Sequence, residues 1–332
     1  MRFMYKLDPQ SVEDFLKENK VEKVAIQAPE GIRPKVKELE DFLLSKDVEP
    51  IFLAKSCYGA CDVADRDAVG LGCDALIHYG HSDMGLDTEV PTLYVEARME
   101  VDPLDALEKA LPELRGSVWG LVSTVQHVHF LSEVQEFLEE EEIESKIGEP
   151  GARAEYPGQI LGCDWGSSDS VADEVDGFIY IGTGEFHPMG VALSTGSPVI
   201  AVNPVANNFE RFDLDMDDFF QKRWALISSV QDAESIGVLV STKEGQNRKG
   251  LAEELKVELE DEGYDAYILV FDDIIPSSLE DFQLDAFVNT ACPRISFSDQ
   301  ESFRKPILSP FEVRVLCGSE DWEDYQLDEI SV

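Results

Sequence analysis

Basic residues are scarce in this chain of 332 residues, which carries 27 lysines and arginines against 68 aspartates and glutamates. The resulting formal net charge of −41 argues against a protein held to nucleic acid by phosphate contacts, because such contacts need a basic face. Two explanations for the excess of acid remain open. It suits a solvated surface in a salty cytosol, where screening is strong, or a surface matched to a basic protein partner.

Long apolar runs are absent as well, since none reaches the roughly 18 residues that a membrane-spanning helix needs. The opening residues, Met1 to Lys6, show no apolar stretch of the kind found in secretion signals. We therefore expect a cytoplasmic protein that does not enter membranes. Six cysteines in a long cytoplasmic chain do not indicate a disulfide framework, so metal binding or catalysis better explains some of them.

No proline- or glycine-rich linker divides the chain, yet its sequence pattern repeats three times. Each copy has an aspartate, a small residue and a short apolar run: residues 74–80, 176–182 and 285–291. A second apolar run that begins with proline follows each of these: residues 91–95, 198–202 and 306–308. A third kind of run precedes them: residues 24–27, 120–123 and 237–241. We predict three closely packed units: residues 1–105, 106–211 and 212–332, the last with a C-terminal segment.

Short apolar runs rich in valine and isoleucine alternate with amphipathic helical patterns in every unit. In the first unit the expected strands are residues 24–28, 50–54, 76–79 and 92–95. The clearest expected helices, one in each unit, are residues 36–44, 131–142 and 250–262. Because helices separate the strands, we predict parallel pairing with right-handed crossovers. The fold class is therefore α/β, with three similar domains, each a small four-stranded parallel sheet flanked by helices.

Each unit contributes one cysteine from a loop near the end of a strand, and these are Cys61, Cys163 and Cys292. Ligands bind beyond the carboxyl ends of the strands in open parallel sheets, and all three cysteines belong to that edge. Three like domains that meet around an axis can bring one thiolate each to a shared point. Three thiolates with an open fourth position suit a 4Fe–4S cluster that binds a substrate at its unique iron.

The remaining cysteines leave some alternatives open. Zinc on three cysteines is the main inorganic competitor, although zinc sites commonly use close CxxC pairs, and three unrelated buried cysteines would need no metal. Cys57 forms a Cys-x-x-x-Cys pair with Cys61, but Ala64 stands where the usual radical S-adenosylmethionine signature has its third cysteine. Cys73 and Cys317 are expected to be small packing residues.

Polar groups stand on the same edge of the predicted sheets. Gln27 ends the first strand, His81 follows the third strand, and Arg294 comes two residues after a candidate ligand. An arginine fork can pair with a carboxylate, and backbone amides in turns can hold one. For each residue, a role as a loop cap or an ordinary surface residue remains the alternative.

Several of these motifs, taken together, resemble the archaeal diphthamide synthase family over nearly the whole chain. The matching stretches are Tyr58-Gly59-Ala60-Cys61-Asp62, Gln27-Ala28-Pro29-Glu30-Gly31, His81-Ser82, Gly162-Cys163-Asp164, Gly184-Glu185-Phe186-His187-Pro188 and Cys292-Pro293-Arg294. The resemblance implies that three similar domains arranged around a shared 4Fe–4S cluster bind it through Cys61, Cys163 and Cys292. It thereby implies the same three ligands as the repeat.

The activity that the resemblance implies is the first step of diphthamide biosynthesis. The enzyme would transfer a 3-amino-3-carboxypropyl group from S-adenosylmethionine to imidazole C2 of one histidine in translation elongation factor 2, by non-standard radical chemistry. It would act as a homodimer with an unidentified electron donor. We expect Gln27, Gly59, His81 and Arg294 to contact bound S-adenosylmethionine, with Arg294 pairing its carboxylate, and we identify no catalytic side chain.

Two other functions compete with this one. A quinolinate synthase-like protein also resembles a triplicated α/β fold with a cluster on three cysteines, but it uses no S-adenosylmethionine. A non-enzymatic iron–sulfur protein would need no substrate pocket and would ideally close its cluster with a fourth ligand.

Overall fold

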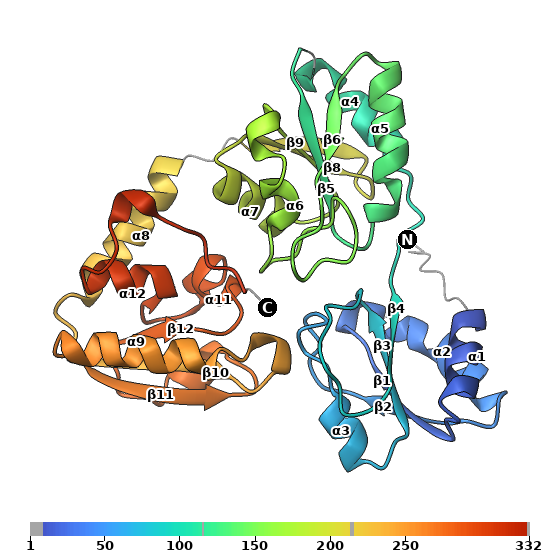
Figure 1. Ribbon diagram of the computed structural model, residues 1–332, viewed down its shortest axis with the longest axis horizontal. Coiled ribbons are helices and arrows are strands. Elements are labelled where there is room, and N and C mark those ends of the chain that lie inside the picture. Colours follow the sequence, from blue (N-terminus) through green and yellow to red (C-terminus); the bar gives the residue numbers. More distant parts are fainter. Residues whose placement is uncertain (1–8, 115, 213–215, 331–332) are drawn as a thin grey trace.

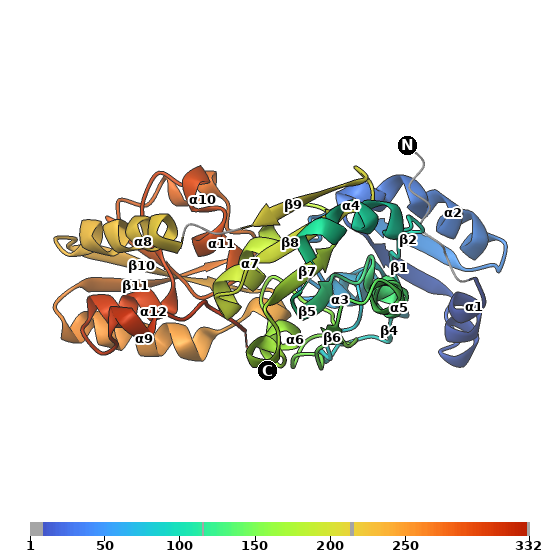
Figure 2. The same cartoon turned by 90° about the horizontal axis from the view of Figure 1, so that it is seen from above.

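The computed structural model describes residues 9–114, 116–212 and 216–330, which form three α/β units. The units lie at the corners of a triangle (Figure 1), and the view from above shows them in one flat arrangement (Figure 2). Within the described residues, no helix is long and apolar enough to cross a membrane. The predicted fold class is confirmed.

All three sheets share one strand order, in which the first strand pairs with both the second and the third. The first sheet runs β2 (Glu49–Leu53), β1 (Lys23–Gln27), β3 (Ala75–Gly80), β4 (Thr92–Glu96). The middle sheet runs β6 (Ser145–Ile147), β5 (Trp119–Ser123), β7 (Gly177–Ile181), β8 (Val199–Asn203), β9 (Asn208–Phe212). The third runs β11 (Asp265–Phe271), β10 (Ser235–Ser241), β12 (Ala286–Asn289), β13 (Ile307–Leu308). The three aspartate-led runs are thus equivalent central strands, as predicted.

The repeated aspartate has the same structural role in every unit. A side-chain oxygen of Asp74 accepts a hydrogen bond from the backbone amide of Lys23 at 2.9 Å, next to the start of the neighbouring strand. Asp176 accepts from Val118 at 2.8 Å, and Asp285 does the same for the third sheet. Each aspartate therefore ties the start of β3, β7 or β12 to the start of the first strand of its unit.

The middle sheet differs from the prediction of four parallel strands, because it carries a fifth strand, β9, that pairs antiparallel with β8. Residues 204–207 alone connect these two strands. Such a connection is too short for a parallel crossover, which needs a dozen or more residues, so the chain turns back on itself.

Helices cover the sheets and separate the strands in sequence. Their bounds are α1 (Pro9–Glu18), α2 (Arg33–Leu44), α3 (Asp65–Gly70), α4 (Leu104–Leu114), α5 (Leu131–Glu140), α6 (Gly166–Asp169), α7 (Phe186–Thr195), α8 (Met216–Val230), α9 (Lys249–Asp261), α10 (Pro276–Leu279), α11 (Arg294–Phe297) and α12 (Pro310–Leu316). The apolar faces of α2, α5 and α9 are buried against their sheets through Leu39, Leu138 and Leu255. The predicted limits near 105 and 212 fall in α4 and at the end of β9, and they stay predictions.

The C-terminal segment, residues 317–330, connects the third unit to the middle unit. Asp328 forms an ion pair with Arg248, at the start of α9, at 2.7 Å. The backbone amide of Ile330 then donates to the carbonyl of Cys163 at 3.0 Å, and that of Trp165 donates to the Glu329 side chain at 3.2 Å. No sequence pattern assigns a role to this segment, and the structure places it beside one of the three candidate cysteines.

Candidate functional site

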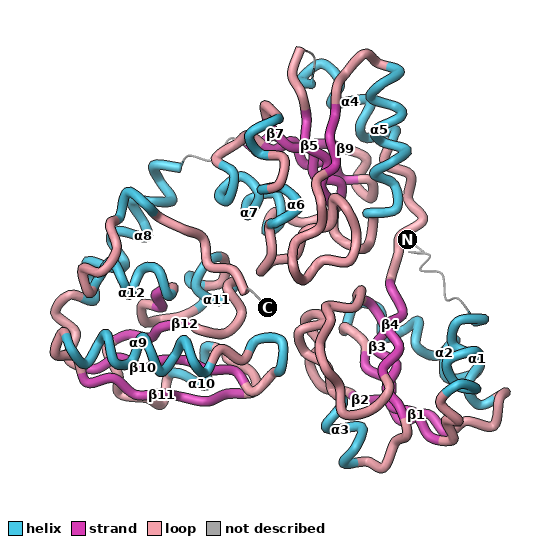
Figure 3. The backbone as a smooth tube through the Cα atoms, in the orientation of Figure 1, coloured by secondary structure: helices cyan, strands magenta, loops and turns pink. Residues whose placement is uncertain are grey.

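A cavity of about 1130 Å³ lies where the three units meet, and loops from all of them line it. Figure 3 shows these loops facing the centre of the arrangement. Cys61, Cys163 and Cys292 all line this one cavity, each from a different unit. The sequence repeat therefore corresponds to three thiols that share one space.

The topology of the sheets explains why these loops converge. Cys61 follows β2, Cys163 follows β6 and Cys292 follows β12, so each cysteine lies beyond the carboxyl end of a parallel strand. Short polar contacts then hold each loop, and at the third cysteine the Asn289 side chain donates to the carbonyl of Cys292 at 2.8 Å. The sheet edge predicted from sequence is the edge that faces the cavity.

Burial makes the three thiols weak acids. It raises the pKa of Cys163 and Cys292 to about 12, and it raises the pKa of Cys61 in the same direction. Repulsion from a neighbouring cysteine thiolate adds to this increase at Cys163 and Cys292. The three sulfurs consequently stay protonated at neutral pH unless a bound cationic group replaces their protons.

Two side chains already donate to these sulfurs, one from the same unit as its cysteine and one from a different unit. Arg153, which is buried in the middle unit, points Nη1 at the sulfur of Cys163 at 3.3 Å. Gln246, from the third unit, points Nε2 at the sulfur of Cys61 at 3.3 Å. Both contacts stabilise a thiolate, so the surroundings fit anionic sulfur ligands.

Close backbone packing brings the third unit to the Cys61 loop. The amide of Gly245 donates to the carbonyl of Cys61 at 3.1 Å, and its own carbonyl accepts from Arg153 Nη2 at 2.7 Å. A Cβ atom at residue 245 would lie 2.6 Å from the Cys61 Cα, so only glycine fits there. Gly245 thereby connects the surroundings of two cysteines that belong to different units.

A buried ion pair holds the same loop from the other side. Lys243, which follows β10, reaches Asp62 at 2.8 Å and Asp273 at 2.5 Å. Its ammonium group also lies 4.7 Å from the centre of the Tyr58 ring. No sequence motif singles out Lys243, Arg153 or Gln246. The available signal is that Lys243 and Gln246 follow a strand end.

The spacing of the three sulfurs discriminates between a single ion and a cluster. One zinc ion with bonds of about 2.3 Å would hold cysteine sulfurs roughly 3.8 Å apart. In the described part of the chain, Cys61, Cys163 and Cys292 do not form a group whose sulfurs all lie within 4.8 Å of one another. A cluster binds each thiolate through a different iron, so its ligands stand farther apart. The donor set therefore fits a 4Fe–4S cluster better than zinc.

The other predicted site residues divide into two groups. Gly59, His81 and Arg294 line the cavity, and Gln27 lies behind it, fully buried. The Gln27 amide donates to the carbonyl of Asp62 at 2.6 Å and accepts from the amide of Ala64 at 2.9 Å. Its polar atoms thus hold the loop that carries Cys61.

Arg294 is the most exposed of the predicted site residues at the cavity. Its side chain is 54% exposed, and its guanidinium lies 4.9 Å from the centre of the Phe186 ring. The Nε atom of Arg294 donates a hydrogen bond to the Asp299 carboxylate at 3.2 Å, and this contact is exposed to solvent. The stacked guanidinium is therefore held in place while donors of its fork remain available for a bound anion.

Cys73 and Cys317 lie away from the cavity and pack as predicted. Cys73 is buried beside Leu76 in the core of the first unit. Cys317 is partly buried against the core of the third unit, at the end of α12. Neither cysteine lines the cavity.

Known proteins resemble this chain over nearly its whole length. A family model described as "Putative diphthamide synthesis protein" matches residues 28–326. The 2-(3-amino-3-carboxypropyl)histidine synthase of Pyrococcus horikoshii is 41% identical, over 96% of this chain and 92% of its own length. Subunit 1 of the Gallus gallus synthase is 32% identical, over 92% of this chain and 75% of that protein.

A solved structure shows the same architecture. The crystal structure of Dph2 from Pyrococcus horikoshii with a 4Fe–4S cluster superposes with a TM-score of 0.91. The two chains are 39% identical, and the match covers 98% of this chain and 94% of the other.

Proposed function

This chain belongs to the diphthamide synthesis protein family, and we propose that it transfers the 3-amino-3-carboxypropyl group of S-adenosylmethionine to imidazole C2 of a histidine in translation elongation factor 2. The observation that carries the proposal is the convergence of one cysteine from each unit on one cavity. Membership of this family argues against the quinolinate synthase-like alternative, and the enzymatic names of its relatives argue against a purely electron-transferring protein.

We propose that Cys61, Cys163 and Cys292 hold the 4Fe–4S cluster and leave its fourth iron open to the substrate. When bound, the cluster supplies one electron to a sulfonium and so allows a carbon–sulfur bond to break. Arg153 and Gln246 donate to two of the three sulfurs and stabilise them as thiolates. The surrounding loops limit the access of water and fix the position of the substrate.

The remaining cavity residues position the sulfonium. Arg294 pairs with the methionine carboxylate, because a carboxylate that loses water on binding needs a charged partner. Gly59 leaves space next to Cys61, since a Cβ there would lie 3.3 Å from the cysteine sulfur. His81 lines the cavity, and Gln27 supports the loop from behind.

Imidazole C2 is a poor nucleophile at neutral pH, which makes a polar alkylation at that carbon difficult. A carbon-centred radical can add to it instead. The choice of which sulfonium bond breaks then depends on which carbon the cavity presents, and here we propose the methionine γ-carbon rather than the ribose 5′-carbon. In the usual radical S-adenosylmethionine signature, one short loop carries all three cysteine ligands. Three ligands from three separate units build a different pocket around the cluster, so the sulfonium can present another carbon.

The nucleoside product tests this choice of bond. Under anaerobic reducing conditions, the reconstituted protein with S-adenosylmethionine is expected to yield 5′-methylthioadenosine and an aminocarboxypropyl fragment. Chromatography of the nucleosides measures the outcome, with the Cys163→Ala protein as the control that should form neither. Predominant 5′-deoxyadenosine would mean that the ribose carbon is presented, and the proposed mechanism would be wrong.

Arg294→Lys tests how the carboxylate is held. The lysine ammonium carries its charge at one point and cannot make the two parallel hydrogen bonds that a guanidinium makes to a carboxylate. We therefore expect the affinity for S-adenosylmethionine to fall about tenfold, or ~1.4 kcal/mol. Isothermal titration calorimetry measures this affinity. Arg304→Lys is the matched control, because that arginine is exposed and lies outside the cavity lining. Equal affinity in the Arg294→Lys and wild-type proteins would remove Arg294 from the substrate site.

The family resemblance carries four further proposals. They are elongation factor 2 as the protein substrate, a homodimer, an unidentified electron donor and a cytoplasmic location. A cavity that is open to the surface and lined by all three units is compatible with a protein substrate that brings its histidine to the bound sulfonium.

A further inference from the structure

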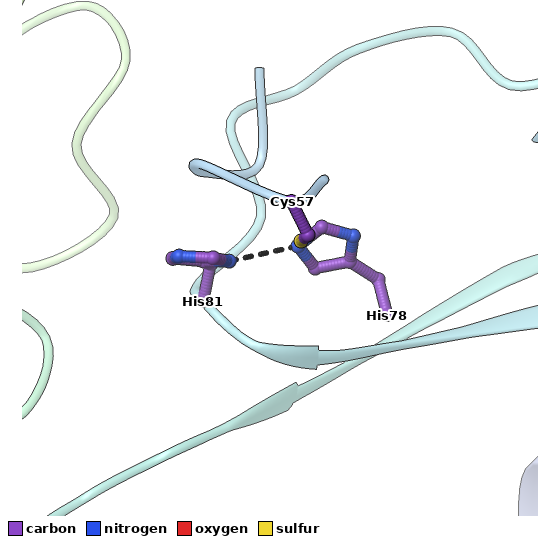
Figure 4. A group of neighbouring side chains, drawn as sticks. All are labelled: Cys57, His78 and His81. Carbon is purple, nitrogen blue, oxygen red and sulfur yellow. Dashed lines mark hydrogen bonds between the residues drawn. The ribbon is translucent and has the colours of Figure 1, made fainter. Parts of the chain in front are cut away.

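A second set of metal-ligating side chains lies next to the cavity. Cys57 belongs to the loop after β2, His78 to β3, and His81 follows the end of β3 (Figure 4). One ligand atom from each of the three lies within 4.8 Å of the other two. We propose that Cys57, His78 and His81 form a binding site for a divalent cation of the zinc class, separate from the three cluster cysteines.

The type of ligand points to this class of cation. Thiolate sulfur and imidazole nitrogen are the ligands that zinc and related transition metals take in proteins, and no carboxylate belongs to the group, so magnesium and calcium are disfavoured. Three protein ligands leave a fourth position for water. His81 lines the cavity while Cys57 and His78 are buried, so an ion can enter from the cavity side.

Hydrogen bonds behind the site fix the orientation of His78. Gln27 donates through Nε2 to a backbone carbonyl and accepts through Oε1 from a backbone amide, so its amide can face only one way. Its Oε1 lies 3.0 Å from His78 Nδ1, which must therefore carry the proton. His78 Nε2 is therefore unprotonated, and its lone pair is directed at the site, as in a typical metal-binding histidine.

The second imidazole completes the pair. His81 Nδ1 lies 2.9 Å from His78 Nε2, and it must donate the proton of that hydrogen bond (Figure 4). Two nitrogens on a tetrahedral zinc ion stand roughly 3.3 Å apart, so an ion can replace the shared proton with little movement. The His81 proton then moves to Nε2, and the nitrogen of this cavity-lining residue changes from acceptor to donor.

Charge balance supports the replacement. Burial lowers the pKa of His81 to about 4 and lowers the pKa of His78 well below its usual value, so both rings are neutral ligands at neutral pH. The Cys57 thiol is buried, and it releases its proton to solvent when the cation binds as one sulfur–metal bond forms. A bound ion would join Cys57 to the end of β3 and so fasten the loop that carries Cys61.

Cobalt binding tests the site directly. The full-length chain with Cys61, Cys163 and Cys292 all changed to alanine removes the competing sulfurs, and circular dichroism checks its fold. Anaerobic titration with Co²⁺ is expected to show that one equivalent binds and gives the visible bands of tetrahedral cobalt–thiolate, and Zn²⁺ should displace it.

Further substitutions in this variant identify the ligands. Adding Cys57→Ser should abolish the thiolate band, and adding His81→Asn should weaken Co²⁺ binding at least tenfold. The matched addition of Cys73→Ser, at another buried cysteine, should change neither. Absence of the bands, or bands that persist with Cys57→Ser, would overturn the proposal.

Metal analysis of the cluster-bearing protein gives a second test if the triple variant does not fold. The wild-type chain, reconstituted and then incubated with Zn²⁺, should retain one zinc per chain in addition to the cluster iron. Cys57→Ser should lose the zinc and keep the iron. Zinc retained by Cys57→Ser, or iron lost together with zinc, would overturn the separate site. Neither test depends on transferase activity, so failure here leaves the proposed function untouched.

Discussion

Changing Cys163 to alanine is expected to remove the cluster and with it the transferase activity. Of the proposed ligand set only two thiolates would remain, which are too few to hold the cluster, and the buried Arg153 would lose its sulfur acceptor. We expect activity to fall by more than the roughly 100-fold that loss of an outer-shell partner costs a metal site. Iron and sulfide content after anaerobic reconstitution, the visible spectrum and 5′-methylthioadenosine formation measure the effect. Cys61→Ala and Cys292→Ala should behave alike.

The remaining cysteines supply the controls for this prediction. Cys73→Ala and Cys317→Ala remove sulfurs that pack in the cores of the first and third units, so iron content and activity should stay near those of the wild type. Full iron loading together with normal activity in Cys163→Ala would exclude that residue from the ligand set. Loss of iron in Cys73→Ala would show instead that the assay reports general unfolding.

Glu312→Ala is expected to cause the largest loss of stability. Glu312 is fully buried in α12 and forms an ion pair with Arg223 of α8, whose Nε donates to it at 2.5 Å. It also accepts from the amide of Ser309 at 2.8 Å as part of the capping box that begins α12. Removing the carboxylate leaves the buried Arg223 guanidinium without its charged partner, which lowers the free energy of unfolding by about 3–5 kcal/mol.

Denaturant titration of the cluster-free protein, followed by tryptophan fluorescence, measures this loss in the free energy of unfolding. The matched control is Glu258→Ala, which breaks the longer and partly exposed pair with Arg314 at 3.6 Å. That change should cost less than about 1 kcal/mol, because exposed ion pairs contribute little. Equal losses of unfolding free energy in the two variants would show that burial does not set the contribution of the Arg223–Glu312 pair.

The triplicated architecture could be predicted from sequence because its signals are local. Apolar runs of strand length, amphipathic helices and one leading aspartate recur in each unit, and each reports on the backbone near it. Strand β9 escaped prediction because Asn208–Phe212 is an edge strand with no buried residue, so it carries no strong apolar signal. Its direction follows from a short connection that only the folded sheet reveals.

The sequence alone determined the fold class, the three repeated units and the three cysteines at the carboxyl edge, because each follows from patterns within one unit. The tertiary structure alone decided what surrounds them. Gln246 and Lys243 reach the Cys61 loop from the third unit, and no periodic signal marks them. Arg153 donates to Cys163 in its own unit and to the carbonyl of Gly245 in the third unit. Gln27 sits at a strand end as expected, yet its side chain turns inward to two backbone groups and His78. Contacts between units depend on how three separate sheets pack together, and local patterns do not encode that packing.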